Sequence, residues 1–253
     1  MKILLGGALG RMGQEVTAAA AEAQVEIVCG VDVAYTGQPS DYPIVTAFDQ
    51  ATQKADVLID FSRPSALPEL LQLVRKEKMP AVLCTTGYNE AELQMIEEAS
   101  REIPVFRSAN MSLGVNVLRH LVQEAARALG EDFDVEIVER HHRMKADSPS
   151  GTALMLYDSV KDATETLRQP VFGRYGRTAQ RQPGEVGIHA VRGGTITGEH
   201  EVCFYGDGEE LILTHRAEKR SLFARGALRA AAFLMDKPAG KYDMQDLIEE
   251  MLR

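Results

Sequence analysis

The chain has 253 residues, of which 45% are hydrophobic and 26% charged, and its formal net charge is −9. This length suffices for one large or two modest domains, and the acidic balance argues against nucleic acid and for a small anionic ligand. Cys29, Cys84 and Cys203 lie far apart without a Cys-x-x-Cys spacing, which indicates reduced thiols and no zinc. With no membrane-length apolar run and no signal-peptide pattern, we expect a cytoplasmic protein.

The first part of the chain is typical of a dinucleotide-binding domain. A short apolar strand, Lys2 to Leu5, precedes a glycine turn and a helix expected from Gln14 to Ala23. The spacing Gly7-x-x-Gly10-x-x-Gly13 departs from the commoner G-x-G-x-x-G. A second strand, Val25 to Val31, ends at Asp32, nineteen positions after Gly13, where a carboxylate can accept hydrogen bonds from an adenosine ribose. Alternatively, the glycines only form a tight turn and Asp32 is a solvated strand end.

Three further units repeat the order of strand and small-residue loop. They are Val57–Ile59 with a helix expected from about Ser65 to Lys76, Ala81–Cys84 with a helix from Glu90 to Ser100, and Val105–Phe106 followed by Ser108–Met111. This alternation predicts a doubly wound parallel sheet of the Rossmann type. Because ligands bind beyond the carboxyl ends of such strands, we expect these loops to meet at one binding edge.

From about Val135 the pattern changes to an alternation of apolar and polar residues. With the strand-like runs Gly198–Phe204 and Glu210–Thr214, it predicts a second, α+β domain built on a mixed or antiparallel sheet. Between these strands we expect a helix from about Gly151 to Arg168 and a loop from Gly173 to Gly187. A long amphipathic helix then covers residues 222–234, with Ser221 as a possible cap, and can return to the first domain.

The stretch from Val138 to Ala153 concentrates groups that bind anions. Ser150-Gly151-Thr152 precedes an apolar run and predicts a helix start whose backbone N–H groups face an incoming anion. Just upstream lie side chains that donate a proton or a charge-assisted hydrogen bond, or add positive field: His141, His142, Lys145, Arg140 and Arg143. A carboxylate suits this arrangement.

Each of these residues has a plainer interpretation when taken alone. A single histidine is more often a satisfied, partly buried residue and a single lysine a surface charge, but we do not favour this for the whole set. His141 and His142 face opposite ways if they lie at a strand end, and no third ligand has a zinc-like spacing, so we expect no metal. Asp147 is expected to be structural, in a turn and capping sequence. His200 and His215 are expected in the core or in an interface.

With these residues the chain resembles a known family, the dihydrodipicolinate reductases, also called 4-hydroxy-tetrahydrodipicolinate reductases. Residues 139–153 match the pattern E-x-H-H-x-x-K-x-D-A-P-S-G-T-A except that Ser148 replaces Ala. Further blocks of the same kind are Gly10–Gly13, Asp60–Pro64, Thr85–Gly87, Asn110–Asn116 and Gly198–His200. The resemblance implies a nicotinamide-cofactor domain, 1–112 with 221–253, and an inserted substrate and oligomerisation domain, 113–220, that builds a homotetramer.

The resemblance also implies roles for individual residues. His141 matches the acid/base histidine and Lys145 the proton-donating lysine, while His142, Gly151 and Thr152 match substrate-binding positions. The cofactor-binding positions are Gly7, Ala8, Leu9, Gly10, Arg11, Met12, Asp32, Cys84, Thr85, Thr86, Ser108, Ala109, Asn110 and Met111. Two of them depart from the family, because Cys84 replaces a glycine and Met111 an aromatic residue.

The implied activity is an NADH- or NADPH-dependent reduction of 4-hydroxy-tetrahydrodipicolinate, via dihydrodipicolinate, to tetrahydrodipicolinate in diaminopimelate and lysine biosynthesis. A hydride from the cofactor, a proton from the protein and cationic or N–H partners for two carboxylates agree with the cluster around His141. Because no basic residue follows Asp32, we expect NADH to serve at least as well as NADPH.

Two other functions remain open at this point. A semialdehyde dehydrogenase would use Cys84 as a nucleophile, but the His-His-x-x-Lys run has no role in thioester chemistry. A nicotinamide-nucleotide sensor without catalysis would be expected to lose His141 or Lys145, and both are present.

Overall fold

The computed structural model describes residues 1–164 and 168–252. Its contacts divide the chain into two compact units. Unit 1 contains Met1–Leu113 and Arg220–Arg253, and unit 2 contains Gly114–Lys219. In the described part, no helix has the length and apolarity needed to cross a membrane. The three cysteines are free and buried.

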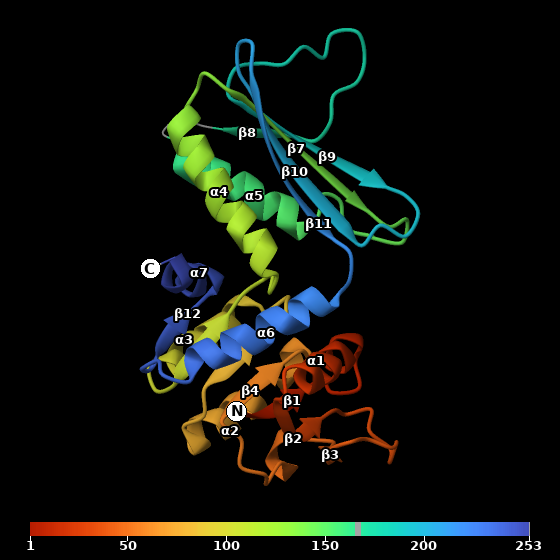
Figure 1. The fold of residues 1–253 in the computed structure, drawn as a ribbon, viewed down its shortest axis with the longest axis vertical. Helices are drawn as coiled ribbons and strands as arrows, with labels where there is room; N and C mark the ends of the chain where they lie inside the picture. The colour runs from red at the N-terminus through yellow and green to blue at the C-terminus, as the bar shows by residue number, and fades with distance from the viewer. Residues whose placement is uncertain (165–167, 253) are drawn as a thin grey trace. The chain divides into compact units, whose positions relative to one another are not determined.

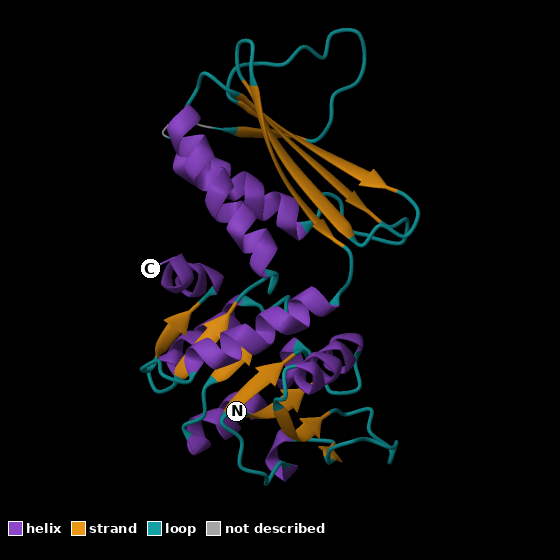
Figure 2. Ribbon diagram, viewed as in Figure 1, coloured by secondary structure: helices purple, strands orange, loops and turns teal. Residues whose placement is uncertain are grey.

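Unit 1 is built on a seven-stranded parallel sheet (Figures 1 and 2) with the order β12-β6-β5-β4-β1-β2-β3. Its strands are β1 (Lys2–Gly6), β2 (Glu26–Val31), β3 (Ile44–Val45), β4 (Val57–Asp60), β5 (Ala81–Leu83), β6 (Pro104–Arg107) and β12 (Gly240–Tyr242). On one side of β1 the sheet continues with β2 and β3, and on the other side it continues with β4, β5, β6 and β12. The doubly wound parallel sheet predicted from the sequence is thus confirmed, with its switch point between β1 and β4.

Helices cover both faces of this sheet because each carries one buried apolar stripe. They are α1 (Arg11–Glu22), α2 (Leu67–Glu77), α3 (Glu90–Ser100), α6 (Ser221–Leu234) and α7 (Met244–Leu252), with the short 3-10 turns η1 (Phe48–Gln50) and η2 (Pro64–Ala66). Helix α6 packs closely with small residues. A Cβ at its Gly226 would lie 1.7 Å from the carbonyl oxygen of Met111, so α6 directly contacts the loop that follows β6.

Unit 2 has a five-stranded mixed sheet of the order β11-β10-β7-β9-β8. The strands are β7 (Asp134–His141), β8 (Gln169–Val171), β9 (Glu185–Arg192), β10 (Gly198–Tyr205) and β11 (Glu210–Ala217), and the helices are α4 (Leu113–Leu129) and α5 (Gly151–Ala163). Alternate β7 residues are buried, as the sequence pattern predicts. The buried side chains pack with α4 and α5 on one face of the sheet, while Figure 2 shows no helix on the other.

Three details of the sequence prediction are wrong. The helix expected to reach Arg168 ends at Ala163, and residues 165–167 of that expectation lie outside the described residues. The expected loop up to Gly187 overlaps β9, which begins at Glu185 and ends at Arg192. Ser221 is not a cap: Arg220 occupies that position and makes no capping side-chain hydrogen bond. The sequence of β9 does not show the alternation of apolar and polar residues typical of a strand, because Val186, Gly187 and Ile188 are all buried.

Candidate functional site

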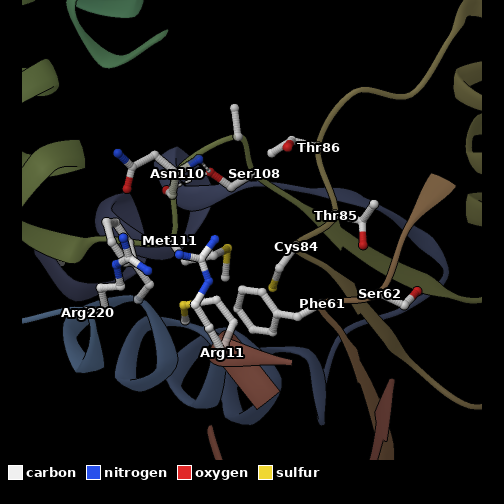
Figure 3. Close-up of a pocket in the computed structure, with 13 residues that line it drawn as sticks. Arg11, Phe61, Ser62, Cys84, Thr85, Thr86, Ser108, Asn110, Met111 and Arg220 are labelled. Carbon is white, nitrogen blue, oxygen red and sulfur yellow. Dashed lines mark hydrogen bonds between the residues drawn. The ribbon is translucent and has the colours of Figure 1, made fainter. Parts of the chain in front are cut away.

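Unit 1 has a cavity of about 590 Å³ beyond the carboxyl ends of β4, β5 and β6 and beside the start of α1. In Figure 3, Ser62, Thr85 and Thr86 lie on one side of it, and Asn110, Met111 and Arg220 on the other. This is the edge at which ligands bind in doubly wound sheets. The predicted meeting of the small-residue loops is therefore present in the structure.

The glycine turn after β1 brings backbone close to backbone. Gly7 has a φ of +74°, and a Cβ at Gly13 would lie 2.2 Å from the carbonyl oxygen of Gly7. Glycine is needed at both positions, for the turn and for the close start of the helix. Helix α1 begins without a side-chain cap and without an acidic residue in its first turn. Its positive end is therefore open to an anion such as a pyrophosphate.

Asp32 fastens this turn to the end of β2. Its two carboxylate oxygens accept hydrogen bonds from the backbone N–H groups of Leu9 and Ala34, both at 2.9 Å. The side chain is half-buried, so Asp32 is more than a solvated strand end. Each oxygen keeps a further lone pair with which it can accept a hydrogen bond from a hydroxyl group.

A second carboxylate, Asp60, joins the loops after β4 and β5. It is buried and accepts hydrogen bonds from the Ser62 backbone N–H at 3.2 Å and the Thr85 hydroxyl at 2.7 Å. Burial raises the pKa of Asp60. Burial, and then the nearby Asp60, raise the pKa of the Cys84 thiol well above its usual value. A protonated buried thiol is a poor nucleophile, which argues against thioester chemistry at this residue.

Nine of the fourteen predicted cofactor positions line the cavity: Arg11, Met12, Cys84, Thr85, Thr86, Ser108, Ala109, Asn110 and Met111. The glycine-turn residues 7–10 and Asp32 lie outside its lining but in the turn that leads to it. Four further residues line the cavity and were not predicted from the sequence: Phe61, Ser62, Arg220 and Phe223. Phe61 and Ser62 belong to the block Asp60–Pro64, whose position after a buried strand was a usable signal. Arg220 and Phe223 reach the cavity only through the packing of α6.

In unit 2, the predicted anion cluster surrounds a buried carboxylate, Glu139. None of its surface is exposed. Two guanidinium nitrogens of Arg192 donate to its two oxygens at 2.7 Å each, and the Ser150 backbone N–H donates at 3.0 Å. The Nδ1 of His141 lies 2.6 Å from one of these oxygens. Burial opposes ionisation of Glu139, but these hydrogen bonds outweigh it and lower the pKa of the carboxyl.

His141 is the last residue of β7 and is 8% exposed. Its ring meets the His200 ring edge to face, with the centroids 5.2 Å apart. A Cβ at Gly198 would lie 3.1 Å from Nε2 of His141, so the glycine leaves room beside this nitrogen. Burial lowers the pKa of His141, against the raising effect of Glu139. His200 is buried and hydrogen-bonded to the Ser150 hydroxyl at 2.9 Å, as expected for a core residue.

The start of α5 lies beside this cluster. Ser150 is the N-cap and accepts a hydrogen bond from the Ala153 backbone N–H, and the first turn, with Gly151 and Thr152, has no acidic residue. A Cβ at Gly151 would meet nothing within 4 Å. The space beside Gly151 is therefore open, and α5 begins at Gly151 with Ser150 as its cap, as the sequence predicts.

Lys145 lies in the loop between β7 and α5. Its ammonium donates to both oxygens of Asp147 at 2.8 Å, and the Lys145 hydrogen bond lowers the pKa of Asp147. The backbone carbonyl of Asp147 in turn accepts a hydrogen bond from Arg192 at 2.7 Å. Asp147 thus orders the loop, as expected, and also holds the lysine. His142 follows the strand and is half-buried. Among the residues that the structure describes, no group of three or more potential ligands is placed to hold a metal ion.

Comparison with known proteins gives a consistent result along the whole chain. The family model described as "Dihydrodipicolinate reductase, N-terminus" matches residues 1–111, and "Dihydrodipicolinate reductase, C-terminus" matches residues 114–248. The chain is 49% identical over 251 residues to a 4-hydroxy-tetrahydrodipicolinate reductase of Caldanaerobacter subterraneus subsp. tengcongensis, covering 99% of both proteins. It is 45% identical over 249 residues to that of Clostridium tetani, covering 98% of this chain and 97% of the other.

Solved structures share the fold. A dipicolinate-bound dihydrodipicolinate reductase from Paenisporosarcina sp. TG-14 matches with a TM-score of 0.78 at 22% identity, over 96% of this chain and 97% of that one. A probable dehydrogenase from Thermotoga maritima matches with a TM-score of 0.64 at 12% identity, over 100% and 94%. At these identities the likeness concerns the fold alone.

The buried His200 predicts a measurable pH dependence of stability. Burial lowers its pKa from 6.5 to about 3, so between these values the unfolded chain takes up a proton that the folded chain does not. The free energy of unfolding therefore decreases as the pH is lowered from about 6.5 to about 3, by at most about 1.4 kcal/mol per pH unit from this residue. His200→Gln is expected to flatten the dependence, measured by urea unfolding at about pH 7 and about pH 5. The same slope in both proteins would contradict the prediction.

Proposed function

The chain belongs to the dihydrodipicolinate reductase family, and on this premise we propose which of its residues carry the reaction. The protein is a 4-hydroxy-tetrahydrodipicolinate reductase of lysine and diaminopimelate biosynthesis, an oxidoreductase whose family implies a nicotinamide cofactor. The reduction needs a hydride, which the nicotinamide supplies when bound, and a proton from the protein. The tasks left to the chain are to hold the cofactor, bind two carboxylates and deliver that proton.

Unit 1 holds the cofactor in this proposal. The uncapped start of α1, which the tight turn at Gly7 and Gly13 leads into, fits a pyrophosphate, because the first N–H groups of a helix have no acceptor within the helix. Asp32 accepts hydrogen bonds from a ribose. The cavity lined by Thr85, Asn110 and their neighbours takes the nicotinamide half. These contacts are supported by the position of the cavity at the switch point of the sheet.

Unit 2 binds the substrate and supplies the proton. Gly151, Thr152 and His142 bind carboxylate at the start of α5, where no acidic side chain competes in the first turn. Lys145 donates the proton, assisted by His141, whose ring is held in one orientation by Glu139. Lys145 first exchanges Asp147 for a substrate carboxylate, a change of partner that keeps the ammonium paired. The observation that carries this assignment is the fixed imidazole beside an open helix start.

Three variants separate proton delivery from anchoring. Lys145→Ala and His141→Gln should lower kcat by about 10²- to 10⁴-fold, the usual size of general acid catalysis, with a modest change in KM. Thr152→Val removes a hydrogen bond to a charged group in both ground and transition states, about 1.5–3 kcal/mol, and should mainly raise KM, by about tenfold to hundredfold. Steady-state kinetics on the three variants checks this.

NADH affinity, measured separately by fluorescence titration, is the control for these variants. It should stay at the wild-type value, because all three residues lie in unit 2 while the proposed cofactor contacts lie in unit 1. If Lys145→Ala keeps a normal kcat and only KM rises, the lysine is an anchor and its catalytic role is wrong.

In this proposal the enzyme uses NADH at least as well as NADPH. Asp32 is followed by Val33, which is 63% exposed, and Ala34. A carboxylate without an adjacent cation repels the 2′-phosphate of NADPH. We expect kcat/KM with NADH to equal or exceed that with NADPH. A clear preference for NADPH would show that a basic side chain from another segment meets the phosphate.

The enzyme is also proposed to be a cytoplasmic homotetramer that pairs through the open face of the unit 2 sheet. This face carries exposed apolar side chains on three strands, Val191, Tyr205 and Ile212, at 45%, 41% and 43% exposure. Exposed apolar groups on a sheet without a covering layer favour a symmetric partner. Multi-angle light scattering at micromolar concentration is expected to give four times the chain mass, and a monomer would refute the proposal.

A further inference from the structure

The carboxylate that contacts the His141 ring is itself paired with an arginine. Glu139 is fully buried and has three kinds of donor around it: His141, the Arg192 guanidinium and the Ser150 N–H. A carboxylate only accepts hydrogen bonds. The proton on the His141 ring therefore lies on Nδ1, and Nε2, beside Gly198, is the nitrogen left to exchange protons.

We infer that Glu139 and Arg192 are positioning residues for the reaction: the carboxylate fixes the tautomer and direction of His141, and the guanidinium holds that carboxylate in place through both of its oxygens. Neither residue contacts substrate in this role. The inference rests on the proposed role of His141.

The β-sheet register explains how the pair is brought to the histidine. Glu139 lies two residues before His141 on β7 and so faces the same side of the sheet, and Arg192 is the direct partner of His141 on the parallel strand β9. The guanidinium spans both oxygens of Glu139 at 2.7 Å. Such a bidentate pair has one geometry, which a single hydrogen bond does not impose.

The charges around the ring act in opposite directions. Glu139 on β7 raises the pKa of His141, while Lys145 in the following loop and Arg192 on β9 lower it. His200 on β10 faces the ring and is neutral at physiological pH, since burial lowers its pKa to about 3. His215, paired with His200 on β11, also has a lowered pKa because of burial. Glu139 is thus the one anion among the described groups that act on His141.

The test compares the pH dependence of kcat/KM in four proteins: wild type, Glu139→Gln, Glu139→Asp and the control Glu136→Gln. An amide at 139 keeps the size of the side chain but removes the charge, and its NH₂ group can donate to Nδ1, which moves the ring proton to Nε2. We expect kcat to fall by about 10²-fold or more and the limb of the profile that belongs to His141 to move about one unit toward lower pH. Glu139→Asp should restore the position of the limb.

Glu136 is a matched control on the opposite face of the same strand. Its carboxylate also binds two arginines and a histidine: Arg174 at 2.9 Å, Arg181, and His189 at 2.7 Å. Glu136→Gln therefore loses a comparable set of ion pairs. Because Glu136 lies on the face proposed to pair, light scattering first checks that the variant keeps the wild-type assembly, and its profile should then keep the wild-type position. A further variant, Arg192→Gln, should move the limb in the opposite direction, toward higher pH, because Glu139 then acts without its counter-charge.

A wild-type profile in Glu139→Gln, or an equal shift in Glu136→Gln, would overturn the inference. Loss of stability alone does not imitate the expected result, because it moves neither the limb nor the affinity for NADH, which is titrated for every variant. The proposed function has its own readout: if His141→Gln keeps a normal kcat, the role of His141 fails, whatever the Glu139 variants show.

Discussion

A single buried charge organises the candidate site of unit 2. Glu139 has no contact with solvent, and an ionised carboxylate in that position is tolerated only when donors surround it. These donors come from β7 itself, from β9 and from the start of α5. The contacts that make the burial possible therefore also fix His141, Arg192 and Ser150 relative to one another, and with them the start of α5.

Unit 1 uses carboxylates in a related way, although its sheet is parallel. Asp32 joins the glycine turn to the end of β2, and Asp60 joins the loops after β4 and β5. Both accept backbone or hydroxyl donors, so the loops at the binding edge are held before any ligand arrives. In both units a helix starts without acidic residues in its first turn. An acidic chain thus keeps two local sites open to anions.

Much of this architecture was predictable from local patterns. Strand, glycine turn and helix repeat with a regular order in the first part of the chain, and alternation in Asp134–His141 indicates one buried sheet face. The anion-binding groups of residues 139–153 could be predicted to lie together, because histidine, lysine and a helix start within one short segment cannot be far apart in space. The doubly wound sheet, the second domain with a mixed sheet and the reductase activity therefore followed from the sequence, whereas the roles of individual site residues remain predictions.

The sequence by itself thus determined the fold class, the family and the segments that bear the candidate site. Only the tertiary structure decided which distant residues complete it. Arg192 reaches Glu139 because parallel pairing of β9 with β7 sets it opposite His141, and Arg220 and Phe223 line the cavity because α6 packs on the sheet. Short-range periodicity records which face of an element is buried. It contains no information on the register between strands separated by fifty residues, which depends on the packing of the whole sheet.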